Sequence, residues 1–151
     1  MLSMFMLLGS CNNPREQSYD INSSVDTTAL FAEYLQKILI PAIPESSHCY
    51  YIISNQGCNE CIKELVSYTK EIFHQLDTTQ NTFINAKSSI ESIFSSEMKS
   101  VFKVDSFGEI SNYALGITNV SLVFTHHQKV DSIVPLKWGD EVKIPSLLKM
   151  K

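Results

Sequence analysis

The chain has 151 residues, of which 44% are hydrophobic and 19% charged, and its formal net charge at pH 7 is −4. These values are typical of one globular domain with a single core, and they exclude a chain that is disordered throughout. The acidic balance and the scattered Lys and Arg residues exclude the basic surface of a nucleic-acid-binding protein. We therefore expect one folded domain and no nucleic-acid partner.

The first eleven residues, MLSMFMLLGSC, form an apolar stretch that is too short to span a bilayer. They end in Leu8-Gly9-Ser10-Cys11, which resembles the lipobox of bacterial lipoproteins. The resemblance implies a signal peptide over residues 1–11 and a lipid on Cys11. No Lys or Arg precedes the apolar run, unlike in the usual signal peptide. The alternative is a buried N-terminal helix in which Cys11 has no special role.

Residues 12–26 are polar and rich in turn-forming side chains, so they predict a flexible tether. An apolar start, a lipidated cysteine and a tether together predict a membrane anchor, which is stable when it carries two or more acyl chains. On this interpretation the protein lies in the bacterial cell envelope and faces the periplasm.

The folded domain is predicted over residues 27–151, where helical periods alternate with short β-branched and aromatic runs. The expected helices are 27–40, 58–76, 88–99 and 108–115, followed by a final helical piece. The expected strands are 49–54, 82–86, 100–105, 120–126 and 129–136. Strand, helix and strand followed by a hairpin indicate a mixed sheet flanked by helices, which is an α/β sandwich.

Cys58 and Cys61 form a C-x-x-C motif where the first core strand gives way to a helix. The first turn of a helix stabilises a thiolate through its unpaired N–H groups and the positive end of its dipole. Cys58 is therefore the expected nucleophile, and Cys61 is expected to resolve the mixed disulfide. Lys63 is expected to support the thiolate, and Glu60 to oppose it.

The same C-x-x-C spacing occurs in zinc sites, which usually have four ligands. The other candidate ligands are one cysteine and four histidines: Cys49, His48, His74, His126 and His127. Cys49 and His48 begin the strand that ends near Cys58, which puts them roughly 25 Å away at about 3.3 Å per residue. No second C-x-x-C exists, so we expect no metal site and no cofactor. Cys49 is expected to be a core thiol.

With the C-x-x-C at the end of the first core strand, residues 50–136 resemble the thioredoxin-like superfamily. The segment 104–136 resembles TlpA-like and peroxiredoxin-type members, which continue with an aspartate, a turn, a short helix, a tyrosine, a glycine and then a strand and hairpin. The residues in register with that pattern are Asp105, Gly108, Tyr113, Gly116 and Phe124. The resemblance implies a three-layer α/β/α sandwich with a mixed central sheet and a C-terminal hairpin.

Three positions depart from the pattern of this superfamily. Gly57 stands where the family usually has Trp, and Ile52 stands where the thioredoxin branch has a buried carboxylate. The cis-proline that shapes the substrate groove is missing, and its place falls at Val120 or Ser121. A cis peptide without proline costs about 2.5–4 kcal/mol, so we expect a trans bond there. A Ser121 hydroxyl beside Cys58 could donate a hydrogen bond to the thiolate.

The resemblance implies a lipid-anchored, extracytoplasmic thiol:disulfide oxidoreductase. Its expected partners are the thiols or disulfides of envelope proteins, or a redox donor protein. The three departures leave a second interpretation open, a binding module that keeps the fold and holds a structural disulfide between Cys58 and Cys61. Peroxidase chemistry fits less well, because no Thr-x-x-Cys replaces the C-x-x-C.

Overall fold

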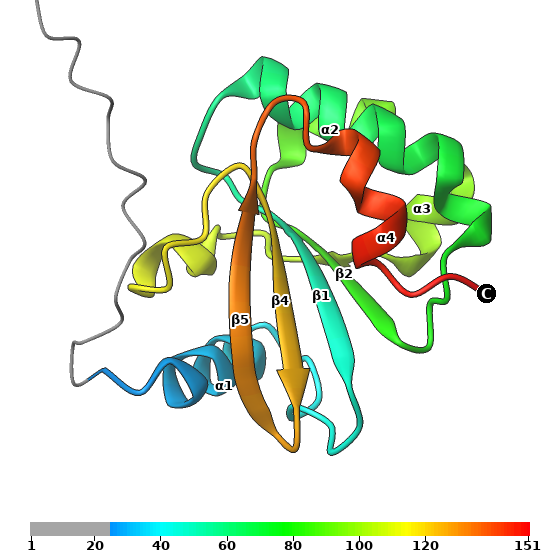
Figure 1. The fold of residues 1–151 in the computed structure, drawn as a ribbon. Coiled ribbons are helices and arrows are strands. Elements are labelled where there is room, and N and C mark those ends of the chain that lie inside the picture. Colours follow the sequence, from blue (N-terminus) through cyan, green and yellow to red (C-terminus); the bar gives the residue numbers. More distant parts are fainter. Residues whose placement is uncertain (1–24) are drawn as a thin grey trace, which may run out of the picture.

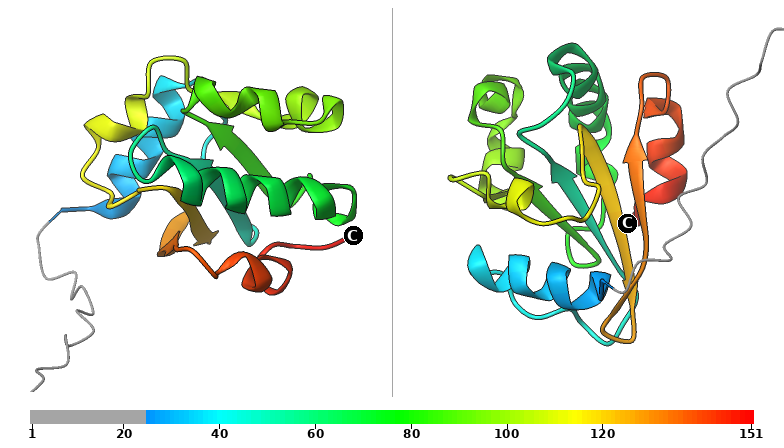
Figure 2. Two further views of the ribbon diagram at one scale, coloured as in Figure 1. Left: turned by 90° about the horizontal axis from the view of Figure 1, so that it is seen from above. Right: turned by 90° about the vertical axis from the view of Figure 1, so that its left-hand side faces the viewer.

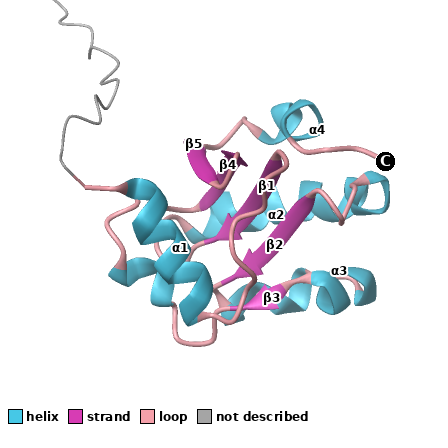
Figure 3. Ribbon diagram, turned by 90° about the horizontal axis from the view of Figure 1, so that it is seen from below, coloured by secondary structure: helices cyan, strands magenta, loops and turns pink. Residues whose placement is uncertain are grey.

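The computed structural model describes residues 25–151, so Cys11, the expected signal peptide and most of the expected tether lie outside the described residues. Five strands form one mixed sheet in the order β3-β2-β1-β4-β5 (Figures 1 and 3). Their bounds are β1 His48–Ile53, β2 Asn81–Asn85, β3 Lys103–Val104, β4 Val120–His126 and β5 Lys129–Leu136. The first three strands are parallel, and β4 runs antiparallel to both β1 and β5. The predicted α/β class and mixed sheet are confirmed.

Helices cover both faces of the sheet (Figure 2). The α-helices are α1 Thr27–Lys37, α2 Asn59–Ile72, α3 Ser96–Val101 and α4 Ile144–Leu147. Short 3-10 helices are η1 Phe73–Gln75, η2 Ser88–Ile93, η3 Glu109–Asn112 and η4 Glu141–Lys143. Buried side chains of α1 and η3 pack on one face, and those of α2, α3 and α4 pack on the other. Within residues 25–151, no helix combines the length and the apolar character that crossing a membrane requires.

Strand β1 lies at the centre of the sheet and is buried on both faces. Its side chains alternate, so that Tyr51 and Ile53 join the cluster beneath α2, whereas Tyr50 and Ile52 join the cluster beneath α1. All four are at most 2% exposed. A strand with apolar contacts on both faces reads as a continuous apolar run, which is why this strand was predictable from sequence.

Helix α1 ends three residues earlier than the predicted helix 27–40. Ile38 is the C-cap, and Leu39 adopts a left-handed conformation with φ of +59°. The N–H of Leu39 donates to the carbonyl of Gln36, and the N–H of Ile40 donates to that of Leu35. These bonds form a Schellman motif, which satisfies the last carbonyls of the helix. Pro41 contributes to this ending, because a residue before proline disfavours the helical conformation.

The predicted helix 88–99 is interrupted. It consists of η2 and α3, which are separated at Phe94 and Ser95, where the backbone is extended. Phe94 is buried in the core, and the Ser95 hydroxyl accepts the N–H of Met98 and so caps α3. Serine competes with helical hydrogen bonding and favours caps, so the serine-rich sequence breaks where Phe94 enters the core. Since α3 continues to Val101, the predicted strand 100–105 shortens to β3.

The predicted C-terminal hairpin is confirmed. His126 pairs with Lys129, and the two residues between them, His127 and Gln128, have φ of +48° and +61°. Positive φ at both central residues is the geometry of a two-residue type I′ turn, whose twist matches that of the strands.

Candidate functional site

One edge of the sheet brings together loops that are distant in sequence. Ile53, at the end of β1, pairs with Asn85 at the end of β2 and with Val120 at the start of β4. The carboxyl ends of the parallel strands and the beginning of β4 therefore lie side by side. The loop 54–58 leaves β1 at this edge and brings Cys58 to the start of α2. Such an edge is where open α/β sheets bind their ligands.

Cys58 is the N-cap residue of α2. Its backbone is extended, with φ of −72° and ψ of 118°, and its Sγ accepts the N–H of Cys61 at 3.4 Å. The thiol thus takes the place that a Ser, Thr or Asp oxygen usually has at a helix start. Cys58 is exposed and Cys61 is partly exposed, and both are free thiols. The helix therefore begins at the nucleophile that the sequence predicts.

The two thiols differ in acidity. Hydrogen bonds from Cys61, first from its thiol and then from its backbone N–H, lower the pKa of Cys58, whereas the Glu60 carboxylate acts to raise it. The pKa of Cys61 is raised, first because its thiol hydrogen is bound to Cys58 and then by partial burial. The hydrogen bond from the Cys61 thiol to the Cys58 sulfur therefore favours Cys58 as the thiolate and Cys61 as the neutral donor. This order matches the roles of attacking and resolving thiol.

Lys63, which is expected to support the thiolate, forms an ion pair with Glu60. Its Nζ lies 2.9 Å from Oε1 of Glu60, and both side chains are largely exposed. Lysine and glutamate three residues apart share one face of a helix, so they pair with each other. An exposed pair of this kind contributes little to stability. Lys63 is therefore paired with the carboxylate that acts to raise the pKa of Cys58.

Asn119 makes the closest links between the dithiol loop and the rest of the sheet. Its side-chain Oδ1 accepts the N–H of Cys58 at 2.8 Å. Its backbone N–H donates to the carbonyl of Gln56 at 2.9 Å, and its carbonyl accepts the N–H of Ser54 at 2.8 Å. Sequence reasoning missed this residue. The available signal is an asparagine directly before a strand, because asparagine tolerates the left-handed conformation that Asn119 adopts.

Val120 and Ser121, the positions predicted for the substrate groove, follow Asn119 and are fully buried. Ser121 lies within the sheet, paired with Ile52, and its hydroxyl donates to the carbonyl of Thr118 at 2.9 Å. No peptide bond among the described residues is cis. The groove role of Val120 and Ser121 stays a prediction, and the residue directly before them, Asn119, hydrogen-bonds to the backbone N–H of Cys58.

Gly57, directly before Cys58, occupies a position that requires glycine. Its φ is +113°, which side chains disfavour. A Cβ at this position would overlap the side-chain oxygen of Asn119. Any residue other than glycine at position 57 must therefore displace Asn119. Ile52, on the strand before the dithiol, is buried against α1 and provides no proton acceptor.

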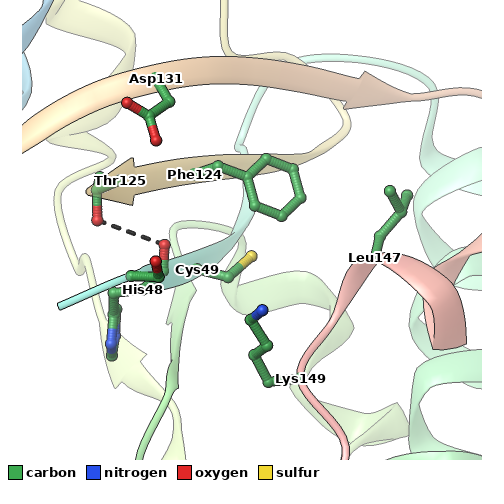
Figure 4. Close-up of a pocket in the computed structure, with 8 residues that line it drawn as sticks. His48, Cys49, Phe124, Thr125, Asp131, Leu147 and Lys149 are labelled. Carbon is green, nitrogen blue, oxygen red and sulfur yellow. Dashed lines mark hydrogen bonds between the residues drawn. The ribbon is translucent and has the colours of Figure 1, made fainter.

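A cavity of about 190 Å³ lies at the other end of β1, where Cys49, Phe124 and Lys149 contribute to its lining (Figure 4). Cys49 is 1% exposed, and burial raises its pKa to about 12 although Lys149 acts to lower it. A buried, neutral thiol is a poor nucleophile and a poor metal ligand. Cys49 is therefore the core thiol that the sequence predicts, separate from the dithiol edge.

Two further sources of information on the site are clusters of possible metal ligands and comparisons with known proteins. Among residues 25–151, no three His, Cys, Asp or Glu side chains gather closely enough to hold a metal ion. Comparisons of the chain with known protein families, with curated proteins and with solved structures gave no match.

Proposed function

We propose that this protein is a thioredoxin-like thiol:disulfide oxidoreductase, anchored through a lipid on Cys11 in the bacterial cell envelope and facing the periplasm. One observation carries the proposal. The exposed thiol of Cys58 caps α2, accepts the N–H of Cys61 and has a lowered pKa. A thiol needs this combination of access and acidity to attack a disulfide near neutral pH.

The topology supports the thioredoxin-like part of the proposal. The C-x-x-C lies between β1 and α2, β1 and β2 are parallel, and the β4–β5 hairpin is antiparallel to β1. Helices lie on both faces of this mixed sheet. These features agree with the arrangement that the sequence resemblance implies, including a dithiol at the edge where β4 begins.

The reaction that fits this geometry is a two-step exchange. The Cys58 thiolate attacks one sulfur of a partner disulfide, which forms a mixed disulfide and releases one partner thiolate. Cys61 then loses its proton and attacks the Cys58 sulfur, which forms the Cys58–Cys61 disulfide and releases the second partner thiolate. Two electrons pass from the dithiol to the partner, and the released thiolates take up protons. A dithiol protein that acts as a redox donor reverses the change.

The surroundings of Cys58 suit a protein partner. Residues 55–60 are all exposed, so the thiol is open to a bulky disulfide. Phe107, which is 89% exposed, neighbours Gly108, whose backbone lies against the side chain of Asn55 in the dithiol loop. An exposed aromatic residue in the segment that packs against the dithiol loop provides apolar contact area for a polypeptide partner. We therefore assign thiols or disulfides of other envelope proteins as the substrates.

A second candidate is a binding module whose Cys58–Cys61 pair forms a structural disulfide. The observation in its favour is that the expected proton acceptor is missing. Ile52 occupies that position and is buried in apolar surroundings. The pKa of the Cys61 thiol is raised, so this thiol needs a base before it can attack. Without a carboxylate at position 52, water must accept the proton. This candidate predicts a stable disulfide that exchanges slowly or not at all.

Trapping of mixed disulfides distinguishes the two candidates. In a Cys61→Ser variant the resolving thiol is absent, so a mixed disulfide through Cys58 should accumulate when the full chain is expressed in a bacterial envelope. The matched Cys58→Ser variant should trap nothing. Detection uses non-reducing gels and mass spectrometry of the bands that disappear on reduction. If neither variant traps a partner, the oxidoreductase proposal fails.

A further inference from the structure

We infer that Asn119 is a positioning residue for Cys58, which sets the acidity of that thiol through the hydrogen bond to its backbone N–H. The inference rests on the proposed function, in which Cys58 attacks disulfides. It assigns a role to a residue that has no thiol and that lies 61 positions from Cys58 in the sequence.

The contacts show how one residue fixes the whole loop. Asn119 bonds to Ser54, to Gln56 and to Cys58, so that every second residue of segment 54–58 is attached to it. The first two bonds use the backbone of Asn119, and only the third uses its side chain. Removing the side chain alone therefore releases Cys58 and leaves the two backbone bonds in place.

The bond to Cys58 determines where its sulfur lies. Cys58 is the N-cap, and its Sγ must face the N–H of Cys61 for the cap to form. Asn119 holds the backbone N–H of Cys58, so the extended conformation of the N-cap is retained. Without the hydrogen bond to Asn119, the bond between the Cys58 sulfur and the N–H of Cys61 forms only part of the time. The thiolate then loses part of the hydrogen bonding that stabilises it, and the thiol becomes less acidic.

The chemistry of the amide is also specific. An asparagine oxygen accepts the N–H of Cys58 without bringing a charge to the thiolate. An aspartate has the same shape and accepts the same bond, but its negative charge disfavours a second negative charge nearby. Gly57 completes the arrangement, because any Cβ at that position would overlap the oxygen of Asn119. The absence of a side chain at residue 57 thus makes room for the contact.

Two variants of the full chain test the inference. Asn119→Gly removes the side chain and tolerates the positive φ of this position, and Asn119→Asp keeps the acceptor and adds a charge. The readout is the rate of iodoacetamide modification of Cys58 in the reduced protein as a function of pH, located by mass spectrometry. Asn112→Asp is the control, because it makes the same chemical change at an exposed residue whose side chain bonds to Glu109.

Both variants should shift the pH profile of Cys58 to higher pH. At pH 7 we expect the rate to fall about three- to tenfold in Asn119→Asp and about two- to threefold in Asn119→Gly, since less of the thiol is ionised. The control should retain the wild-type profile. If both profiles coincide with that of the wild type, Asn119 is only a structural brace and the inference is wrong, whatever the change in stability.

The outcome is separable from that of the proposed function, because alkylation reports acidity and requires no partner. A shifted profile in a protein that never exchanges disulfides would support the inference and overturn the oxidoreductase proposal. If Asn119→Gly does not fold, Asn119→Ala takes its place, because it also removes the acceptor that Asn119→Asp retains.

Discussion

The backbone N–H of Cys58 donates a hydrogen bond of 2.8 Å to the side-chain oxygen of Asn119. This bond attaches the start of α2 to the start of β4, next to the pairing of Ile53 with Val120. The dithiol loop is therefore held by the C-terminal half of the chain. The hydrogen bond from the N-cap of α2 therefore reaches the part of the chain that leads into β4, which pairs with β1.

The three described cysteines should react in a fixed order. Alkylation follows the thiolate, so the rate for each thiol rises with pH and levels off above its pKa. Because the pKa of Cys58 is lowered, its alkylation rate should rise at a lower pH than that of an ordinary thiol. Because the pKa of Cys61 is raised, its alkylation rate should rise at a higher pH. Cys49, with a pKa of about 12 and almost no exposure, should react only after unfolding.

This order is measured on the reduced protein near pH 7 by mass spectrometry of timed samples. The control adds denaturant, in which all cysteines should react at similar rates. Equal reaction of Cys58 and Cys61 in the folded protein would contradict the difference in acidity. Early reaction of Cys49 would contradict its burial.

Leu39→Gly should stabilise the fold. Leu39 is 92% exposed and adopts the left-handed conformation at the end of α1, which costs a residue with a Cβ about 1–2 kcal/mol. Glycine avoids this cost but loses more entropy on folding, so we expect a net gain of about 0.5–1 kcal/mol in the free energy of unfolding. Urea denaturation followed by circular dichroism measures the change. Leu39→Ala is the matched control and should give no gain, since alanine keeps the Cβ.

Cys11→Ser should release the protein from membranes. The prediction rests on the sequence Leu8-Gly9-Ser10-Cys11, because these residues lie outside the described part of the chain. Expressed in a bacterial host, the wild type should fractionate with membranes and carry the mass of acyl chains on Cys11. The variant should be found in the soluble fraction with no added mass. Unchanged fractionation and mass would rule out the lipid anchor.

Much of the sheet is predictable because its signals are local. The continuous apolar run of β1 reflects burial on both faces, and the two-residue turn at His127 and Gln128 separates two strand-like runs. The place of Cys58 at a helix start is predictable too, because Gly57 ends the strand pattern immediately before it. In each case, the residues that carry the signal are the residues that form the element.

The differences arise where tertiary contacts decide the backbone. The segment 88–99 has the apolar spacing of one helix, but burial of Phe94 and capping by Ser95 divide it. Asn119 has no local signature beyond its position before a strand, because its partners come from a segment about 60 residues earlier. Val120 and Ser121, the positions counted from Gly116, follow Asn119 directly in β4, and their groove role stays a prediction.

The reduction potential of the Cys58–Cys61 pair, measured together with its rate of exchange with glutathione, tests the proposed function most directly. A thiol that is exposed, acidic and followed by a resolving thiol should equilibrate reversibly, and its potential should lie above about −300 mV. The Cys49→Ser variant provides the matched control and should give the same potential, because Cys49 is buried away from the dithiol. A potential below about −300 mV without measurable exchange would show that the pair is a structural disulfide and contradict the oxidoreductase proposal.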